Sequence, residues 1–157
     1  MTEPQIQLRE AQPYLGIRER LTAGVPEFAD RVFPELFGWL GQNGVQPAGP
    51  PFIRYVELEA SGEPVELEVG VPVANGAGGD GRVRADALPA GRWLTHLHVG
   101  PYRSETLPDL GSARDELVAW AEERELSYTV AVEHYRIGPV EEPDFTKWET
   151  EFAYLLG

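Results

Sequence analysis

An internal repeat is the sequence feature that most restricts the fold of this chain. Three pairs of matching landmark residues recur at a nearly constant offset: Pro26 and Pro108 by 82 residues, Trp39 and Trp120 by 81, and Tyr55 and Tyr135 by 80. Self-similarity at a fixed offset indicates two copies of one structural unit. We therefore predict one domain over residues 1–157, made of a repeat at about 5–73, a mobile glycine-rich linker at 74–87 and a second repeat at about 88–157.

Each copy is predicted to run strand, helix, strand, strand. An apolar stripe at helical spacing follows Pro26, and Pro34 inside it predicts a kink or two short helices. Pro108 opens the equivalent helix of the second copy. Apolar or alternating segments predict the strands: Gln5–Glu10, Tyr14–Leu21, Phe52–Glu59, Val65–Val73, Arg92–Val99, Val130–Gly138 and about Phe145–Leu155. The economical assembly is an α+β fold with one antiparallel sheet, two helices and a central cleft where the two β-α-β-β units meet.

Composition restricts the function classes. The chain has a net charge of −13, which disfavours a phosphate backbone as a partner and attracts cationic ligands. It contains no cysteine, so disulfides and thiolate metal sites are excluded. No apolar run reaches the ~20 residues of a membrane span, and the N-terminus lacks the pattern of a signal peptide. These features favour a cytoplasmic protein without direct nucleic-acid or membrane partners.

Glu133 is the residue that most invites a functional interpretation. It lies in the strand Val130–Gly138, where alternation places it on one face with Ala131 and Tyr135. A carboxylate among apolar and aromatic side chains is costly to bury without a partner. Either a neighbour such as a tyrosine hydroxyl satisfies Glu133, or the carboxylate awaits a ligand.

Other motifs carry weaker signals. His96 and His98 share a strand face, but no third ligand follows at a recognisable metal-binding spacing, so neither a metal nor another cofactor is predicted. The sequence has no G-x-S-x-G, phosphate-loop or dinucleotide-binding pattern. Glu66 and Glu68 alternate with an apolar face and are predicted to lie mainly at the surface.

The order and spacing of four segments resemble the GyrI-like small-molecule binding domain, also called the effector-binding domain of bacterial transcription activators. The segments cover most of the chain: Ala48–Phe52 leading to Tyr55, Leu67–Val73, Leu88–Gly91 followed by His98–Tyr102, and Trp120 followed by Glu133 and Tyr135. This resemblance implies a duplicated β-α-β-β fold and a pocket for bulky hydrophobic or cationic molecules. By this resemblance, Glu133 matches the family's pocket glutamate and Tyr55 matches its strand tyrosine.

The resemblance, together with the strand patterns, yields a set of predicted ligand contacts: Glu133, Tyr135, Tyr55, Trp39, Trp93 and Glu68. The expected function is a stand-alone, multidrug-like binding protein, because no basic helix-turn-helix segment flanks the domain. Two alternatives stay open. Relatives include hydrolases of cyclopropane-bearing genotoxic natural products, for which Glu133 and Tyr55 would be catalytic, and proteins that interact with DNA gyrase.

Overall fold

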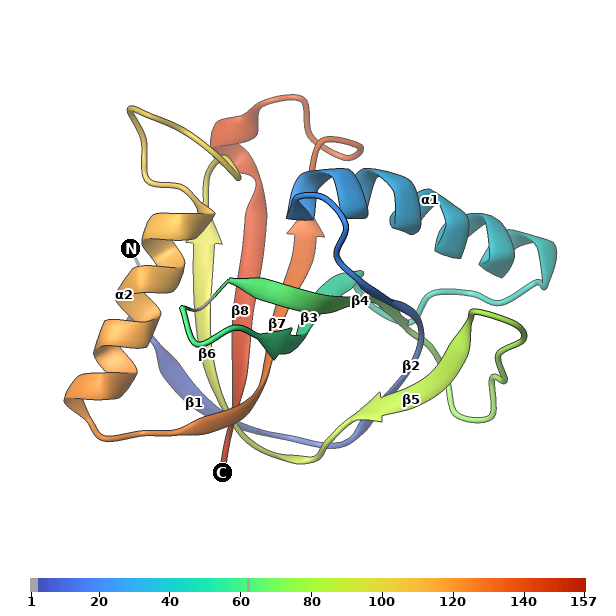
Figure 1. Ribbon diagram of the computed structural model, residues 1–157, viewed down its shortest axis with the longest axis horizontal. Helices are drawn as coiled ribbons and strands as arrows, with labels where there is room; N and C mark the ends of the chain where they lie inside the picture. Colours follow the sequence, from blue (N-terminus) through green and yellow to red (C-terminus); the bar gives the residue numbers. More distant parts are fainter. Residues whose placement is uncertain (1–2, 62) are drawn as a thin grey trace. The chain divides into compact units, whose positions relative to one another are not determined.

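The computed structural model describes residues 3–61 and 63–157. The chain divides into two compact units. The C-terminal unit consists of Met1–Arg9 together with Gly91–Gly157, and the N-terminal unit is Glu10–Ala90. The fold is α+β, as the sequence predicts: in the described residues each unit has one α-helix and a set of antiparallel strands (Figure 1).

The N-terminal unit runs strand, helix, strand, strand and ends on a further strand. Its elements are β2 (Gln12–Arg20), α1 (Val25–Gln42), β3 (Phe52–Leu58), β4 (Pro64–Pro72) and β5 (Arg84–Leu88). The strands pair in the order β3-β4-β2-β5. The predicted hairpin turn between β3 and β4 includes Gly62, which lies outside the described residues.

The C-terminal unit repeats this topology. Its elements are β1 (Gln5–Arg9), β6 (Gly91–Val99), α2 (Leu110–Glu123), β7 (Tyr128–Ile137), the 3-10 turn η1 (Phe145–Lys147) and β8 (Glu149–Leu156). The strands pair in the order β7-β8-β6-β1. Both units therefore share one strand order. In each unit the first strand of the β-α-β-β repeat also pairs with an outer strand: β2 pairs with β5, and β6 pairs with β1. This confirms the predicted duplication.

Several boundaries differ from the prediction for local reasons. The last part of the expected linker forms β5, since its backbone pairs with the edge of β2. The helix α1 continues through Pro34, an exposed position, as a single helix. The helix α2 begins at Leu110 because Asp109 and Ser112 form a reciprocal capping box (3.1 and 2.9 Å). The segment at Phe145 starts as a 3-10 turn capped by Asp144, which delays β8 to Glu149.

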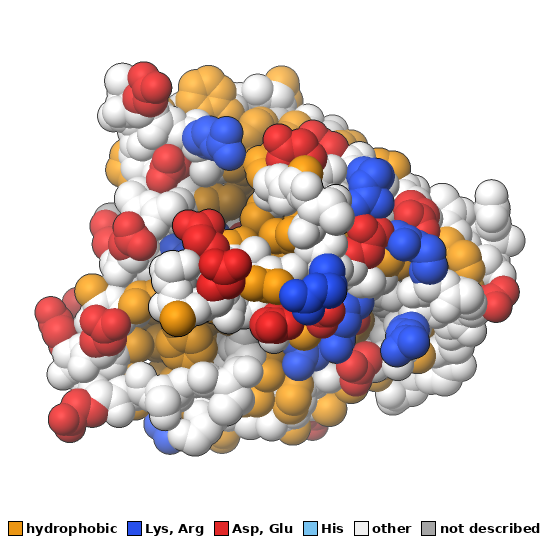
Figure 2. All heavy atoms as spheres, viewed as in Figure 1, with side chains coloured by type: hydrophobic (Ala, Val, Ile, Leu, Met, Phe, Trp, Pro, Cys, Tyr) orange, Lys and Arg blue, Asp and Glu red, His pale blue; other side chains and the backbone are white. Residues whose placement is uncertain are grey.

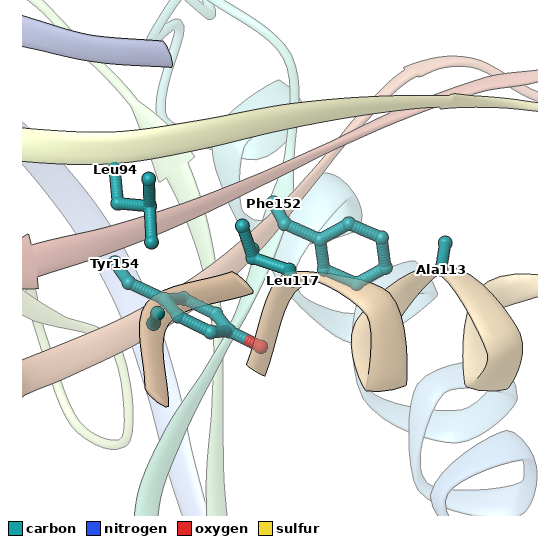
Figure 3. Packing of buried hydrophobic residues seen from close by; sticks show 6 residues of the cluster. Leu94, Ala113, Leu117, Phe152 and Tyr154 are labelled. Atoms are coloured by element: carbon teal, nitrogen blue, oxygen red, sulfur yellow. The ribbon is translucent and has the colours of Figure 1, made fainter. Parts of the chain in front are cut away.

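Each helix packs one apolar stripe on its sheet. The buried positions recur every four residues: Phe28, Val32, Leu36 and Leu40 in α1, and Ala113, Leu117 and Ala121 in α2. Figure 3 shows Leu117 and Ala113 of α2 close to Phe152 of β8, with Leu94 of β6 beside Tyr154. The core of the C-terminal unit therefore lies between α2 and the strands β6 and β8.

Candidate functional site

Strand register defines what α2 covers in the C-terminal unit. Cross-strand partners on β6, β8 and β7 form two rows of side chains: the Glu133 row (His96, Phe152, Glu133) and the Tyr135 row (His98, Thr150, Tyr135). Phe152 belongs to the core packed against α2. Because directly paired residues point to the same face of a sheet, both rows face the helix. Glu133 and Tyr135 thus share a face, as the alternation predicts.

Glu133 is buried and both of its carboxylate oxygens accept hydrogen bonds. Its exposed fraction is 2%. Arg114, on α2, donates from Nη2 to Oε1 and forms an ion pair with it. The Tyr135 hydroxyl donates to Oε2 at 2.9 Å. The predicted tyrosine neighbour is therefore present, and Arg114 is a partner that the sequence analysis missed.

The N-terminal unit has different residues at the positions that correspond to the Glu133 row. When the repeats are aligned on Tyr55 and Tyr135, the positions equivalent to the Glu133 row hold three apolar residues: Ile17, Val69 and Ile53. These three side chains are at most 2% exposed. Arg31 of α1 donates to Glu19, two residues after Ile17 on β2, which places that side of β2 against α1. The helix-facing row is thus apolar in one repeat and partly polar in the other.

Arg114 follows the same pattern. The helices end at equivalent residues, Asn43 and Arg124, which are 81 apart. At this offset Arg114 corresponds to Phe33. The apolar pair Phe33 and Ile53 of one repeat is thus an arginine–glutamate pair in the other. The sequence signal for Arg114 is the repeat itself: the offset of 81 relates Arg114 to Phe33, and the offset of 80 relates Glu133 to Ile53.

Half-buried aromatic rings extend from the Tyr135 row. The ring of Tyr102 lies 5.7 Å from that of Tyr135 and 4.7 Å from that of Trp148. The Trp148 indole donates to the Glu142 carbonyl at 2.7 Å, which fixes the ring. Burial raises the pKa of Tyr102 to about 12, so its hydroxyl stays protonated near neutral pH. We call Tyr135, Tyr102 and Trp148 the aromatic series; its first member, Tyr135, contacts the buried carboxylate of Glu133.

Two polar side chains under α2 are buried without hydrogen bonds to other described residues. They are His96, whose two ring nitrogens are both involved, and the hydroxyl of Thr150. His96 is 4% exposed, and its Nε2 lies 3.8 Å from the Glu116 carboxylate. His98 differs, since its Nε2 lies 3.0 Å from the Pro101 carbonyl. Among residues 3–61 and 63–157, no group of three or more potential ligand side chains could hold a metal ion.

We expect His96 to make stability depend on pH. Burial lowers its pKa despite the opposing effect of Glu116, so the unfolded chain binds a proton that the folded chain excludes. This stability is fully present above the ordinary histidine pKa of about 6.5 and is lost as pH falls below it. His96→Ile, which copies Ile17, should reduce the slope between about pH 7.5 and 5.5 and add about 1 kcal/mol near neutral pH. Urea unfolding at several pH values measures both effects, and an unchanged slope would contradict the assignment.

Three predicted contacts belong to the N-terminal unit. Glu68, on β4 of the N-terminal unit, is 3% exposed rather than at the surface. It accepts a 2.5 Å hydrogen bond from Tyr14 and pairs with Arg18 at 3.6 Å. Burial raises the pKa of Tyr14, with the contact to Glu68 adding to the effect. Tyr55 and Trp39 belong to the same unit and are half-buried.

Trp93 belongs to the C-terminal unit but not to the cluster around Glu133. It is 2% exposed and precedes Leu94, a residue of the core under α2. Successive strand residues point to opposite faces, so Trp93 lies on the side away from α2. The structure thus brings Glu133 and Tyr135 together, while the predicted cleft at the junction of the repeats stays a prediction.

Comparison with known proteins places this architecture in a family. The GyrI-like small molecule binding domain matches residues 2–153. The chain belongs to this family. No curated protein sequence matches this GyrI-like domain significantly. Within the described residues, no helix has the length and apolar character needed to cross a membrane.

Solved structures share the fold at low sequence identity. The C-terminal domain of EcmrR matches with a TM-score of 0.79 at 20% identity, covering 99% of this chain and 97% of that one. EcmrR in its complex with DNA matches with a TM-score of 0.85 at 19% identity over 98% of this chain, which spans only 57% of that longer chain. SAV2435 bound to tetraphenylphosphonium (TM-score 0.57, 14% identity, 99% and 94% covered) and a hydrolase from Listeria innocua (0.58, 11%, 99% and 92%) also match. At these identities the likeness shows the fold of this GyrI-like domain alone.

Proposed function

We propose that this GyrI-like domain binds bulky hydrophobic or cationic small molecules beside Glu133, as a multidrug-like binding protein. The observation that carries the proposal is a buried carboxylate that accepts a hydrogen bond from Tyr135, the first ring of the aromatic series, in one compact unit. A carboxylate supplies charge for an organic cation, and each suitably placed ring adds ~0.5–2 kcal/mol of cation–π attraction. Half-buried rings also offer apolar area to a neutral ligand.

The contrast between the repeats supports a binding role for Glu133. The apolar residues Phe33 and Ile53 hold the equivalent positions in the N-terminal unit, so that repeat folds without charges there. Replacing a buried ion pair by apolar side chains of similar volume is often neutral or stabilising. Stability alone therefore gives little reason for a buried glutamate at this position, whereas ligand recognition gives a direct one.

The charge of the chain favours cations over nucleic acids as partners. The net charge is −13, and Figure 2 shows acidic side chains spread over the surface that α2 forms. The exposed acids of this helix are Asp115, Glu116, Glu122 and Glu123. A phosphate backbone would be repelled by such a surface, so we expect no direct binding to duplex DNA. A protein partner such as gyrase stays a prediction.

Glu133→Gln tests the binding proposal. The variant keeps the shape of the side chain but removes its charge, so we expect the Kd for tetraphenylphosphonium to rise about 5- to 150-fold. The neutral triphenylphosphine oxide should change by less than about threefold. Isothermal titration calorimetry measures both constants.

Glu123→Gln is the matched control for the change in net charge. The Glu123 side chain is 76% exposed, so the substitution should leave both Kd values near those of the wild type. Equal Kd values for tetraphenylphosphonium in wild type and Glu133→Gln would show that Glu133 is a structural acid. The contribution of the other predicted contacts, Tyr55, Trp39, Trp93 and Glu68, stays a prediction.

A hydrolase is the second candidate, favoured by the 2.9 Å contact between the Tyr135 hydroxyl and Glu133. In such a reaction the oxygen of water bonds to a carbon of a strained cyclopropane ring and a ring C–C bond breaks. Glu133 takes the proton from water, and a tyrosine hydroxyl, Tyr135 here or the predicted Tyr55, donates a proton to the ring carbon released by the broken bond. The proton on Glu133 then returns to the tyrosinate, which restores both groups. Mass spectrometry of a cyclopropane-bearing electrophile incubated with the protein separates the two candidates. Turnover that Glu133→Gln abolishes would establish the enzyme, and a stoichiometric complex without product would establish the binding protein.

A further inference from the structure

We propose that Arg114 is a resident cation, which a cationic ligand replaces at Glu133, and that Arg114 therefore sets the affinity and charge selectivity of the site. This inference rests on the proposed function. It gives a role in the site to a residue of α2 that the sequence analysis did not include among the predicted ligand contacts.

The first observation is the position of the Arg114 guanidinium. It forms an ion pair with Oε1 of Glu133, while Tyr135 donates to Oε2. An organic cation that approached this carboxylate would meet a positive charge already in place. The two cations repel each other at short range, and this repulsion is weakly screened near a buried group. A cation thus binds tightly only if the guanidinium moves away.

The second observation is that the partners differ in exposure. The Arg114 side chain is 38% exposed, whereas that of Glu133 is 2% exposed. Arginine has a long, flexible stem, and its charged end is readily hydrated at a surface. Arg114 can therefore leave toward solvent while Glu133 stays under the helix. The acidic surface of α2 also favours a displaced positive charge over a displaced negative one (Figure 2).

The third observation comes from the repeat. Phe33 and Ile53 hold the positions of Arg114 and Glu133 in the N-terminal unit, so one repeat has both charges and the other has neither. A glutamate alone would bury an uncompensated charge whenever the site is empty, which is strongly unfavourable. Arg114 removes that penalty in the empty state. The same contact lowers the apparent affinity for any cation, because only the fraction of the protein in which Arg114 has left Glu133 can bind the cation.

The test compares tetraphenylphosphonium with the neutral triphenylphosphine oxide in variants of the full chain. In Arg114→Met the competing charge is gone, so we expect tetraphenylphosphonium to bind at least ~10-fold more tightly than to the wild type. The neutral probe should stay within ~3-fold. Arg114→Lys retains a competing cation and should stay close to the wild type for both probes.

A second neutral variant guards against a folding defect in Arg114→Met. Arg114→Gln removes the charge but retains an amide N–H that can donate to Glu133, and it should also tighten tetraphenylphosphonium binding. The double variant Arg114→Met with Glu133→Gln should lose this gain, because the carboxylate that the ligand contacts is absent. Circular dichroism and thermal unfolding establish which variants are folded.

The outcomes separate this inference from the proposed function. If the wild type binds tetraphenylphosphonium through Glu133 but no folded neutral variant of Arg114 binds it more tightly, the inference is overturned and the proposed function stands. If neither probe binds the wild type or any folded variant, the proposed function is overturned and the inference falls with it. A gain of equal size for the neutral probe would also overturn the inference, because it would show that Arg114 acts by its bulk.

Discussion

Phe152→Ala is expected to lower the free energy of unfolding by about 3–5 kcal/mol, the largest loss of stability that we predict. Phe152 is fully buried, and it lies on β8 at the centre of the cluster that α2 covers (Figure 3). Its ring also lies under Arg114, whose guanidinium carbon is 5.9 Å from the ring centroid. Removing the ring leaves a cavity between helix and sheet that the packed strands fill only in part. Urea denaturation of wild type and variant measures the difference.

Phe145→Ala is the matched control. Phe145 lies in the 3-10 turn of the same unit and is 48% exposed. The centroid of its ring lies 6.4 Å from that of Trp148. We expect this substitution to change the free energy of unfolding by about 0.5 kcal/mol or less. A loss below about 1 kcal/mol for Phe152→Ala would contradict the assignment of the core.

The repeat and most of the secondary structure could be predicted because they depend on local sequence patterns. The offset of 80–82 residues predicts two equivalent units, and both have the same strand order. The apolar stripe after Pro26 predicts the buried side of α1. Pairing of β5 with β2 was not predictable in the same way, because backbone hydrogen bonds to an edge strand leave little trace in composition.

The candidate site could be predicted only in part. Alternation along one strand is sufficient to place Glu133 and Tyr135 on one face. Arg114 comes from a helix 19 residues earlier, and nothing in the pattern of a single helix distinguishes it from a surface arginine. Glu68 alternates with apolar residues as a surface acid would, yet Tyr14 and Arg18 satisfy it in a buried position. Such contacts depend on tertiary packing between segments.

The second large effect is expected when the charged pair is replaced by its counterpart from the other repeat. The double variant Arg114→Phe with Glu133→Ile copies Phe33 and Ile53. An apolar pair there needs no compensating charge, so the variant should be at least as stable as the wild type. It also removes the carboxylate and fills its surroundings. We therefore expect the Kd for tetraphenylphosphonium to rise at least ~100-fold.

Each single substitution of the pair serves as a control for the double variant. Arg114→Phe alone leaves a buried carboxylate without its arginine and should be less stable than the double variant by about 3–5 kcal/mol. Glu133→Ile alone leaves a half-exposed arginine, which water can solvate, and should have a smaller effect. A double-mutant cycle on unfolding free energies then gives the coupling between the two side chains.

Titration of tetraphenylphosphonium into the folded double variant tests most directly whether the charged pair of the C-terminal unit serves binding rather than folding. Our account predicts a cooperatively unfolding protein, at least as stable as the wild type, that binds the cation at least ~100-fold more weakly. Wild-type affinity in this variant would contradict the account, because it would show that the cation binds without Glu133.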